Sequence, residues 1–431
     1  MNKIITVAAA LLLSSTALHA QESELLKKYR TMALSYNQDV KAADKGVAYY
    51  KEMESSAKAD MLPKVAANAT ASYVGNPMEL SITLPSLGAF SFEGKHENYG
   101  TSVSMVQPVY TGGRNLEQVK IAQKESALSE DQAALTRSTV TFGTDYRYWN
   151  AVAAQEMVAV TQQLEKSMEN LVRVVRERVD AGLVNKNDLL MAEVKLNDAR
   201  FQRKKAQDSF EVSRMALNSQ IGVNLKAATA IDTSIPVLRL AGDFATEVEA
   251  ALNNRAEVRM AQGKIAIQES AGKVKDSYYK PQFYLGAEGS YSSPGYNFKP
   301  DMDPNYAVYA KLSIPVFEWG KRKSSRRASS IRVDMAKENL NKVTDNVRLE
   351  AQSAYYSYSQ AVEQVLLTEN SLEKAKDNEQ MALDRYKEGN LSILETLDAQ
   401  LYHQMAQINH IRSRANAQIY YSEFLRALGK Y

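Results

Sequence analysis

The sequence predicts an α+β protein built from two copies of one unit, each with a helix, a β-hairpin and a long helical hairpin. Residues 109–235 and 316–431 contain no proline and few glycines, and they are rich in residues that favour helices. Residues 62–110 and 281–316 instead alternate between apolar and polar positions, which is the period of a β-strand. The two halves of the chain also match each other at a fixed offset.

This internal match is most simply explained by a duplication. Residues 108–114 correspond to residues 315–321, and the same offset of 207 residues relates Gly182 to Gly389 without a gap. Upstream the offset becomes 218, so the first β-hairpin carries 11 extra residues in its loop. We therefore predict a first repeat, a linker and a second repeat, at residues 21–222, 223–243 and 244–431.

A long helical hairpin is predicted in each half, at 115–222 with its tip near 182–188 and at 321–429 with its tip near 389–395. The first helix extends over roughly 67 residues, or about 100 Å at 1.5 Å per residue. Such an arm is comparable in length with the width of a periplasm. A globular enzyme has no need of two such arms.

Capping residues mark the turn at each tip. Gly182 is placed to end the first long helix as a C′ glycine. Asn185 with Asp188, three residues later, resembles a capping box that starts the return helix. Ser392 and Glu395 provide a full S-x-x-E capping box at the second tip. Both hairpins are therefore expected to turn tightly.

Residues 1–20 have the pattern of a secretory signal peptide. Lys3 precedes a nearly uninterrupted stretch of apolar or small residues, and small residues stand where cleavage is expected, after Ala17 or after Ala20. The chain is therefore expected to be exported.

Composition excludes several other classes of protein. The 53 basic and 50 acidic residues are nearly balanced, so a nucleic-acid partner is not expected. The chain has no cysteine, which excludes disulfides, thiolate metal sites and cysteine nucleophiles. The four histidines do not fall at metal-ligand spacing, and there is no phosphate-binding loop or convergent Ser/His/Asp set. We therefore predict no enzyme activity, no cofactor and no metal site.

The two β-hairpins, at 62–110 and 281–316, supply only four strands per chain. A barrel needs about eight strands to close, so closure is expected to involve several chains. In the last strand, alternate residues form an apolar face and a more polar face: Tyr306, Val308, Ala310, Leu312 and Ile314 against Ala307, Tyr309, Lys311 and Ser313. This pattern fits an α+β membrane protein with lipid outside and water inside, and a soluble sheet packed on one face would alternate in the same way.

The two tips carry a resemblance to a known family. RVDAGLVNKNDL at 178–189, RYKEGNLSILETLDA at 385–399 and the strand-to-helix passages at 107–110 and 314–317 resemble the TolC-type outer-membrane efflux proteins. The resemblance covers nearly all of the mature chain. It implies a homotrimer with a 12-stranded β-barrel continuous with a long periplasmic α-helical barrel, in the outer membrane of a Gram-negative-type bacterium. The linker at 223–243 would belong to a collar around that barrel.

The family's function is the exit duct of a tripartite efflux pump, which passively conducts small molecules across the outer membrane. The partners that the resemblance implies are two further copies of the chain, a periplasmic adaptor (membrane fusion) protein, an inner-membrane transporter and outer-membrane lipid. The exit duct of a type I protein-secretion system would have the same sequence features. A periplasmic coiled-coil scaffold is the other alternative.

The resemblance also places a gate at the tips. Asp188, Tyr386, Glu395 and Asp398 match positions that form gate hydrogen bonds or line the constriction in the family. Glu395 and Asp398 lie three residues apart on one helix face, so three copies would form a ring of carboxylates; Asp188 and Glu395 could equally serve only as helix caps. The adaptor is expected to meet the turn residues: Gly182, Leu183, Val184, Gly389, Asn390 and Leu391.

Overall fold

The structure is a computed structural model that describes residues 23–85, 88–238, 245–295 and 301–431. The predicted signal peptide lies outside these residues. The chain divides into two compact units, and each unit draws on both sequence repeats. Unit 1 comprises Met1–Lys45, Asp131–Arg259 and Asn341–Tyr431, and unit 2 comprises Gly46–Glu130 and Met260–Leu340.

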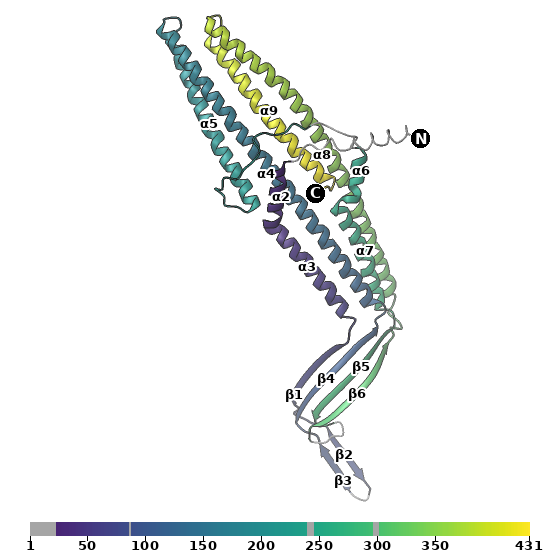
Figure 1. The fold of residues 1–431 in the computed structure, drawn as a ribbon. Coiled ribbons are helices and arrows are strands. Elements are labelled where there is room, and N and C mark those ends of the chain that lie inside the picture. Colours follow the sequence, from purple (N-terminus) through teal and green to yellow (C-terminus); the bar gives the residue numbers. More distant parts are fainter. Residues whose placement is uncertain (1–22, 86–87, 239–244, 296–300) are drawn as a thin grey trace, which may run out of the picture. The chain divides into compact units, whose positions relative to one another are not determined.

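Unit 2 contains a four-stranded antiparallel sheet in the order β1-β4-β5-β6 (Figure 1). The central pair, β4 and β5, joins the two halves of the chain, with Val103 opposite Gly289. Within the described part of the chain, β1 and β6 each pair on one side only. The strands are β1 (Lys64–Tyr73), β4 (Glu97–Tyr110), β5 (Gln282–Ser293) and β6 (Asp303–Ser313).

The longer loop of the first β-hairpin has a structure of its own. Its residues form β2 (Glu79–Leu84) and β3 (Gly88–Glu93), which pair antiparallel with Glu79 opposite Glu93. Apolar residues alternate with polar ones along these strands, as Leu80 and Ile82 show. The insertion that distinguishes the first repeat is therefore a second, two-stranded sheet.

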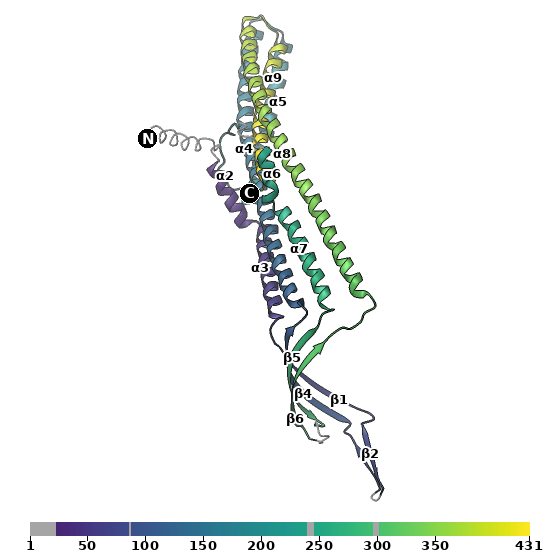
Figure 2. The ribbon, with the colours of Figure 1, turned by 90° about the vertical axis from the view of Figure 1, so that its right-hand side faces the viewer.

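Two antiparallel helical hairpins make up most of unit 1 (Figures 1 and 2). The first consists of α4 (Arg114–Asp180) and α5 (Lys186–Ile221), and the second of α8 (Lys321–Glu388) and α9 (Ile393–Ala427); α4 and α8 begin in unit 2. Two shorter helices precede the strands of each half: α2 (Glu24–Tyr36), α3 (Gln38–Ala59), α6 (Ala245–Asn254) and α7 (Ala256–Ser277). Among the described residues, none of these helices combines the length and the apolar character needed to cross a membrane.

The duplication also appears in how each return helix ends. Gly222 follows α5 with φ 76°, and Gly429 follows α9 with φ 68°, a backbone region that favours glycine. A Cβ on Gly222 would lie 2.1 Å from the ring of Tyr36, and one on Gly429 would lie 3.2 Å from the backbone of Asn254. Tyr36 and Asn254 are the last residues of α2 and α6. Both repeats therefore pack the end of the return helix against the end of their first short helix.

The linker predicted at 223–243 lies against the long helices as far as it is described. The backbone N–H of Ile235 donates to Glu156 of α4 at 2.8 Å, and Arg414 of α9 pairs with the same carboxylate. Ile235 itself is buried. The linker residues 239–243 lie outside the described residues. The linker therefore bridges the two hairpins of unit 1.

Candidate functional site: the hairpin tips

The two hairpin tips end their first helix with the same backbone motif. Gly182 and Gly389 have φ angles of 70° and 82°. The N–H of Gly182 donates to the carbonyl of Val179, and that of Leu183 to the carbonyl of Arg178, both at 2.9 Å. The second tip repeats this pair of bonds at 3.0 and 2.9 Å. The pair is a Schellman motif, which confirms Gly182 as a C′ glycine.

The return helices begin with different caps. The Ser392 hydroxyl accepts the N–H of Glu395 at 3.3 Å, and Glu395 Oε2 accepts the N–H of Ser392 at 3.0 Å, so this capping box is confirmed. Hydrogen bonds from Ser392 lower the pKa of Glu395. Asn185 is the N-cap of α5, but the predicted capping box is wrong, because the side chain of Asn185 accepts the N–H of Asn187, at 3.5 Å, and not that of Asp188. Aspartate is one methylene shorter than glutamate, which makes the return bond of a capping box harder to form.

Arg178 joins the end of α4 to the end of α8. Its guanidinium lies 5.0 Å from the centroid of the Tyr386 ring. Its Nη1 also donates to the backbone carbonyl of Tyr386 and, at 3.1 Å, to that of Lys387. These carbonyls belong to the last turn of α8, where the free lone pairs of the carbonyl oxygens and the helix dipole favour a positive charge. Arg178 therefore caps α8 from the other hairpin.

Tyr386 is buried at the tip, with 2% of its surface exposed. Burial raises the pKa of Tyr386; the charge of Arg178 lowers this pKa and that of Asp188 raises it. Within the described residues its hydroxyl has no hydrogen-bond partner. Tyr386 therefore contributes to the tip through the contacts of its aromatic ring. The apolar cluster around it includes Met168, Leu171, Val175, Leu196 and Leu397.

Asp398 lines a cleft of about 640 Å³ between α5 and α9. Lys195 and Asp198 of α5 line the same cleft. Asp398 is exposed, so its carboxylate is free to interact with solvent or solutes there. Glu395 is also exposed but is engaged in the capping box and does not line the cleft. Much of the remaining wall is apolar: Leu164, Met168, Leu190, Val194, Leu394 and Leu401.

The turn residues form the ends of the two hairpins. Leu183 is 68% exposed, whereas Val184 and Leu391 are half-buried. A Cβ on Gly182 would meet nothing within 4 Å. The Asn390 amide donates to Glu388 at 3.3 Å within its own turn. The first turn therefore presents an accessible apolar side chain.

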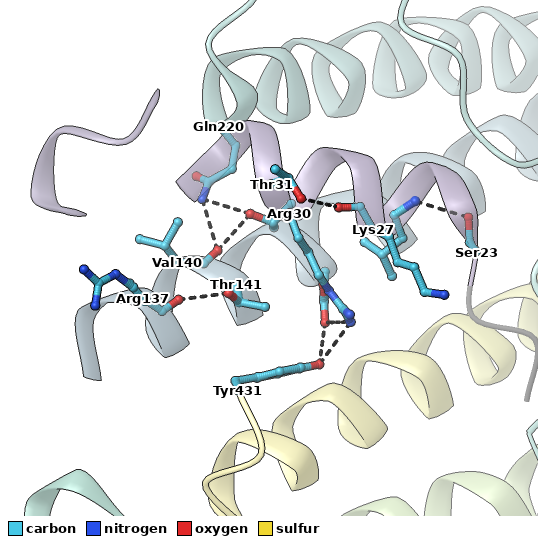
Figure 3. A network of polar contacts seen from close by, with 12 residues as sticks. Ser23, Lys27, Arg30, Thr31, Arg137, Val140, Thr141, Gln220 and Tyr431 are labelled. Atoms are coloured by element: carbon cyan, nitrogen blue, oxygen red, sulfur yellow. Dashed lines mark hydrogen bonds and ion pairs between the residues drawn. The ribbon is translucent and has the colours of Figure 1, made fainter. Parts of the chain in front are cut away.

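A buried ion pair in unit 1, which no sequence pattern predicts, joins α2, α4 and Tyr431. Arg30 donates from Nε and Nη2 to the two carboxylate oxygens of Asp145, at 2.6 and 2.7 Å. The Tyr431 hydroxyl donates to Asp145 at 2.6 Å, and Figure 3 shows Tyr431 and Arg30 pointing toward one another. The side chain of Asp145 is fully buried. No local sequence pattern predicts this cluster, because its residues come from three distant segments of the chain.

Comparisons with known proteins agree with the geometry. The chain is similar in structure to CusC (TM-score 0.80, 17% identity, covering 95% of this chain and 92% of that one). It is also similar to the CmeC outer membrane channel of Campylobacter jejuni (0.76, 18%, 94% and 86%) and to the open state of the MtrE outer membrane channel of Neisseria gonorrhoeae (0.76, 19%, 94% and 88%). At these identities the likeness establishes the fold.

Family membership rests on sequence. A comparison with curated proteins gives no match. The model of the family described as outer membrane efflux protein matches residues 30–223 and 248–430, which is most of the chain. The chain therefore belongs to the outer membrane efflux protein family, as its tip motifs predict, and is an efflux protein of the outer membrane.

Proposed function

We propose that three copies of the chain close their sheets into one 12-stranded barrel that continues into a long α-helical barrel. The observation that carries this proposal is the four-stranded sheet, whose outer strands β1 and β6 each have one edge without a partner strand among the residues that the structure describes. Hydrocarbon offers backbone groups no hydrogen bonds, so a sheet that spans a bilayer must close on itself. Three such sheets supply 12 strands, which lies in the range of transmembrane barrels.

The side chains of β6 support the same arrangement. Tyr306, Val308 and Leu312 share one face and are 85%, 79% and 61% exposed in the single chain. Such a contiguous apolar stripe suits contact with lipid. On the other face, Tyr309 packs over Gly286, where a Cβ would lie 2.3 Å from the tyrosine ring. The same face carries Lys311 and Ser313, so the two faces of the strand differ in polarity as a lipid-facing and a water-facing side would.

The assembled trimer is proposed to be the passive exit duct of a tripartite pump for small molecules. The family is an efflux family and not an enzyme family. The proposed partners are a periplasmic adaptor protein and an inner-membrane transporter. The adaptor would dock on the turns, where Leu183 offers an exposed apolar contact next to the conformationally fixed Gly182.

We expect the protein to fractionate with the outer membrane as a signal-processed oligomer. Chemical cross-linking after detergent extraction should stop at three subunits, because three sheets complete the barrel. The purified trimer should conduct ions in planar bilayers. A stable monomer with a closed barrel would refute the trimer, and a soluble protein without bilayer conductance would favour the coiled-coil scaffold.

The gate is proposed to lie at the tips, with Asp398 as its charged component. Tyr386 would keep the tip closed through the packing around its ring, and Asp188 would contribute through its charge, which lies near enough to raise the pKa of Tyr386. Glu395 would act mainly through its capping box, since Ser392 already occupies its carboxylate. Asp398 has no such engagement with a cap and lines the cleft. Three copies of Asp398 around a narrow axis would attract cations.

Replacing Asp398 by Asn should weaken cation selectivity and block by trivalent cations. The substitution keeps the shape of the side chain and removes one negative charge per subunit from the cleft. Single-channel recordings in planar bilayers would measure both properties. Asp384→Asn is the matched control, because Asp384 is exposed near the same tip but does not line the cleft. Equal effects of the two substitutions would mean that general surface charge, and not a ring of Asp398, sets selectivity.

A further inference from the structure

The duplication gives Arg178 an equivalent that the single chain leaves unused. Arg178 and Arg385 lie 207 residues apart, at the same position of the two Schellman motifs. Arg178 of the first hairpin caps the end of α8 in the second hairpin. Arg385 is exposed, and no hydrogen bond or ion pair of its side chain is found among the described residues. One of two equivalent arginines is thus engaged and the other is not.

The acceptors of Arg178 also have unused equivalents. Tyr386 and Lys387, whose carbonyls accept from Arg178, correspond to Val179 and Asp180 at the end of α4. Asp180 is exposed, and no hydrogen bond or ion pair of its carboxylate is found within the described part of the chain. The first hairpin therefore ends in an available anion beside last-turn carbonyls, and the second hairpin ends in an available cation.

We propose that Arg385 of one subunit caps the C-terminal end of α4 in the next subunit and pairs there with Asp180. The proposal rests on the trimer of the proposed function. Within a chain, the first hairpin provides the donor and the second hairpin the acceptor. Every chain therefore keeps an unused donor, Arg385, and an unused acceptor, the end of α4. A closed ring of such chains uses both, because the second hairpin of each chain meets the first hairpin of the next.

Charge complementarity favours a second copy of this chain as the partner of Arg385. Within the chain, the end that Arg178 caps carries Lys387, whose ammonium pairs with Asp384 at 3.1 Å, and the Tyr386 ring lies against the Arg178 guanidinium. At the end of α4, Val179 stands in place of the tyrosine, so the ring is missing, and Asp180 stands in place of Lys387, so a carboxylate replaces the ammonium. The contact within a chain therefore includes a cation–π interaction of Arg178 with Tyr386, and the contact between chains would include an ion pair of Arg385 with Asp180. The tips of the trimer are held by six arginines, three within chains and three between them.

Cross-linking tests this contact cleanly, because the chain has no cysteine of its own. Two differently tagged chains are co-expressed, one with Arg385→Cys and the other with Asp180→Cys, and the extracted protein is treated with a short bis-maleimide. We expect a covalent product that carries both tags on a denaturing gel. The matched control is one chain with Arg178→Cys and Lys387→Cys, which should link internally without joining two chains.

The outcomes separate this inference from the proposed function. An amine-reactive cross-linker, applied to the same samples, reports whether the trimer exists. A trimer in which the control links internally but Arg385→Cys and Asp180→Cys chains stay unlinked would overturn the inference alone. A monomer would overturn both proposals. As a second readout, Arg385→Asp should raise the conductance of the closed tip, and adding Asp180→Arg should return it toward the parent value.

Discussion

Replacing Asp145 by Asn is expected to lower the free energy of unfolding by about 3–5 kcal/mol, the cost of leaving a buried charge without its partner. The carboxylate is fully buried, and the Arg30 side chain that it neutralises is only 17% exposed. The substitution keeps the size of the side chain but removes the charge that holds Arg30 and Tyr431 together. Chemical unfolding followed by helical circular dichroism would measure the loss.

Asp44→Asn is the matched control for this prediction. Asp44 pairs with Arg137 of the same long helix, but both side chains are about half exposed, at 50% and 46%. Exposed pairs contribute about 0–1 kcal/mol, because water screens the charges and solvates each partner alone. Equal losses from Asp44→Asn and Asp145→Asn would show that burial of the Arg30 pair contributes nothing to stability.

Replacing Tyr386 by Ala should destabilise the tip by about 3–5 kcal/mol, the usual cost of deleting a buried aromatic ring. The ring fills the cluster between the hairpins and supports the Arg178 guanidinium that caps α8. A loosened tip should raise the conductance of the closed channel in planar bilayers. The same purified variant should unfold at lower denaturant concentration.

Tyr386→Phe separates the ring from the hydroxyl. The hydroxyl has no hydrogen-bond partner among the described residues, so its removal should leave conductance and stability close to those of the parent. A large effect of Tyr386→Phe would mean that the phenol forms a gate hydrogen bond in the trimer, as the family resemblance implies. A small effect of Tyr386→Ala would exclude the tyrosine from tip closure.

Local chemistry explains what could be predicted from the sequence. The glycine at 182 and the capping box of Ser392 and Glu395 depend on hydrogen bonds between residues three to five positions apart, so composition and spacing are enough to find them. The long helices and the hairpin strands follow from periodicity in the same way. Asn185 does cap α5, but it forms no capping box with Asp188. The aspartate is one methylene shorter than Glu395 of the second tip, a difference that the spacing alone does not reveal.

The duplication, the helical and strand segments and the capped turns were thus determined by the sequence itself. Tertiary structure alone decided that Arg178 reaches α8 while Arg385 stays exposed, although the two occupy equivalent positions. It also decided that Asp145 is neutralised by Arg30, 115 residues away, and that each compact unit combines parts of both repeats. These contacts depend on which distant surfaces meet after the chain has folded, and neither periodicity nor local spacing records that choice.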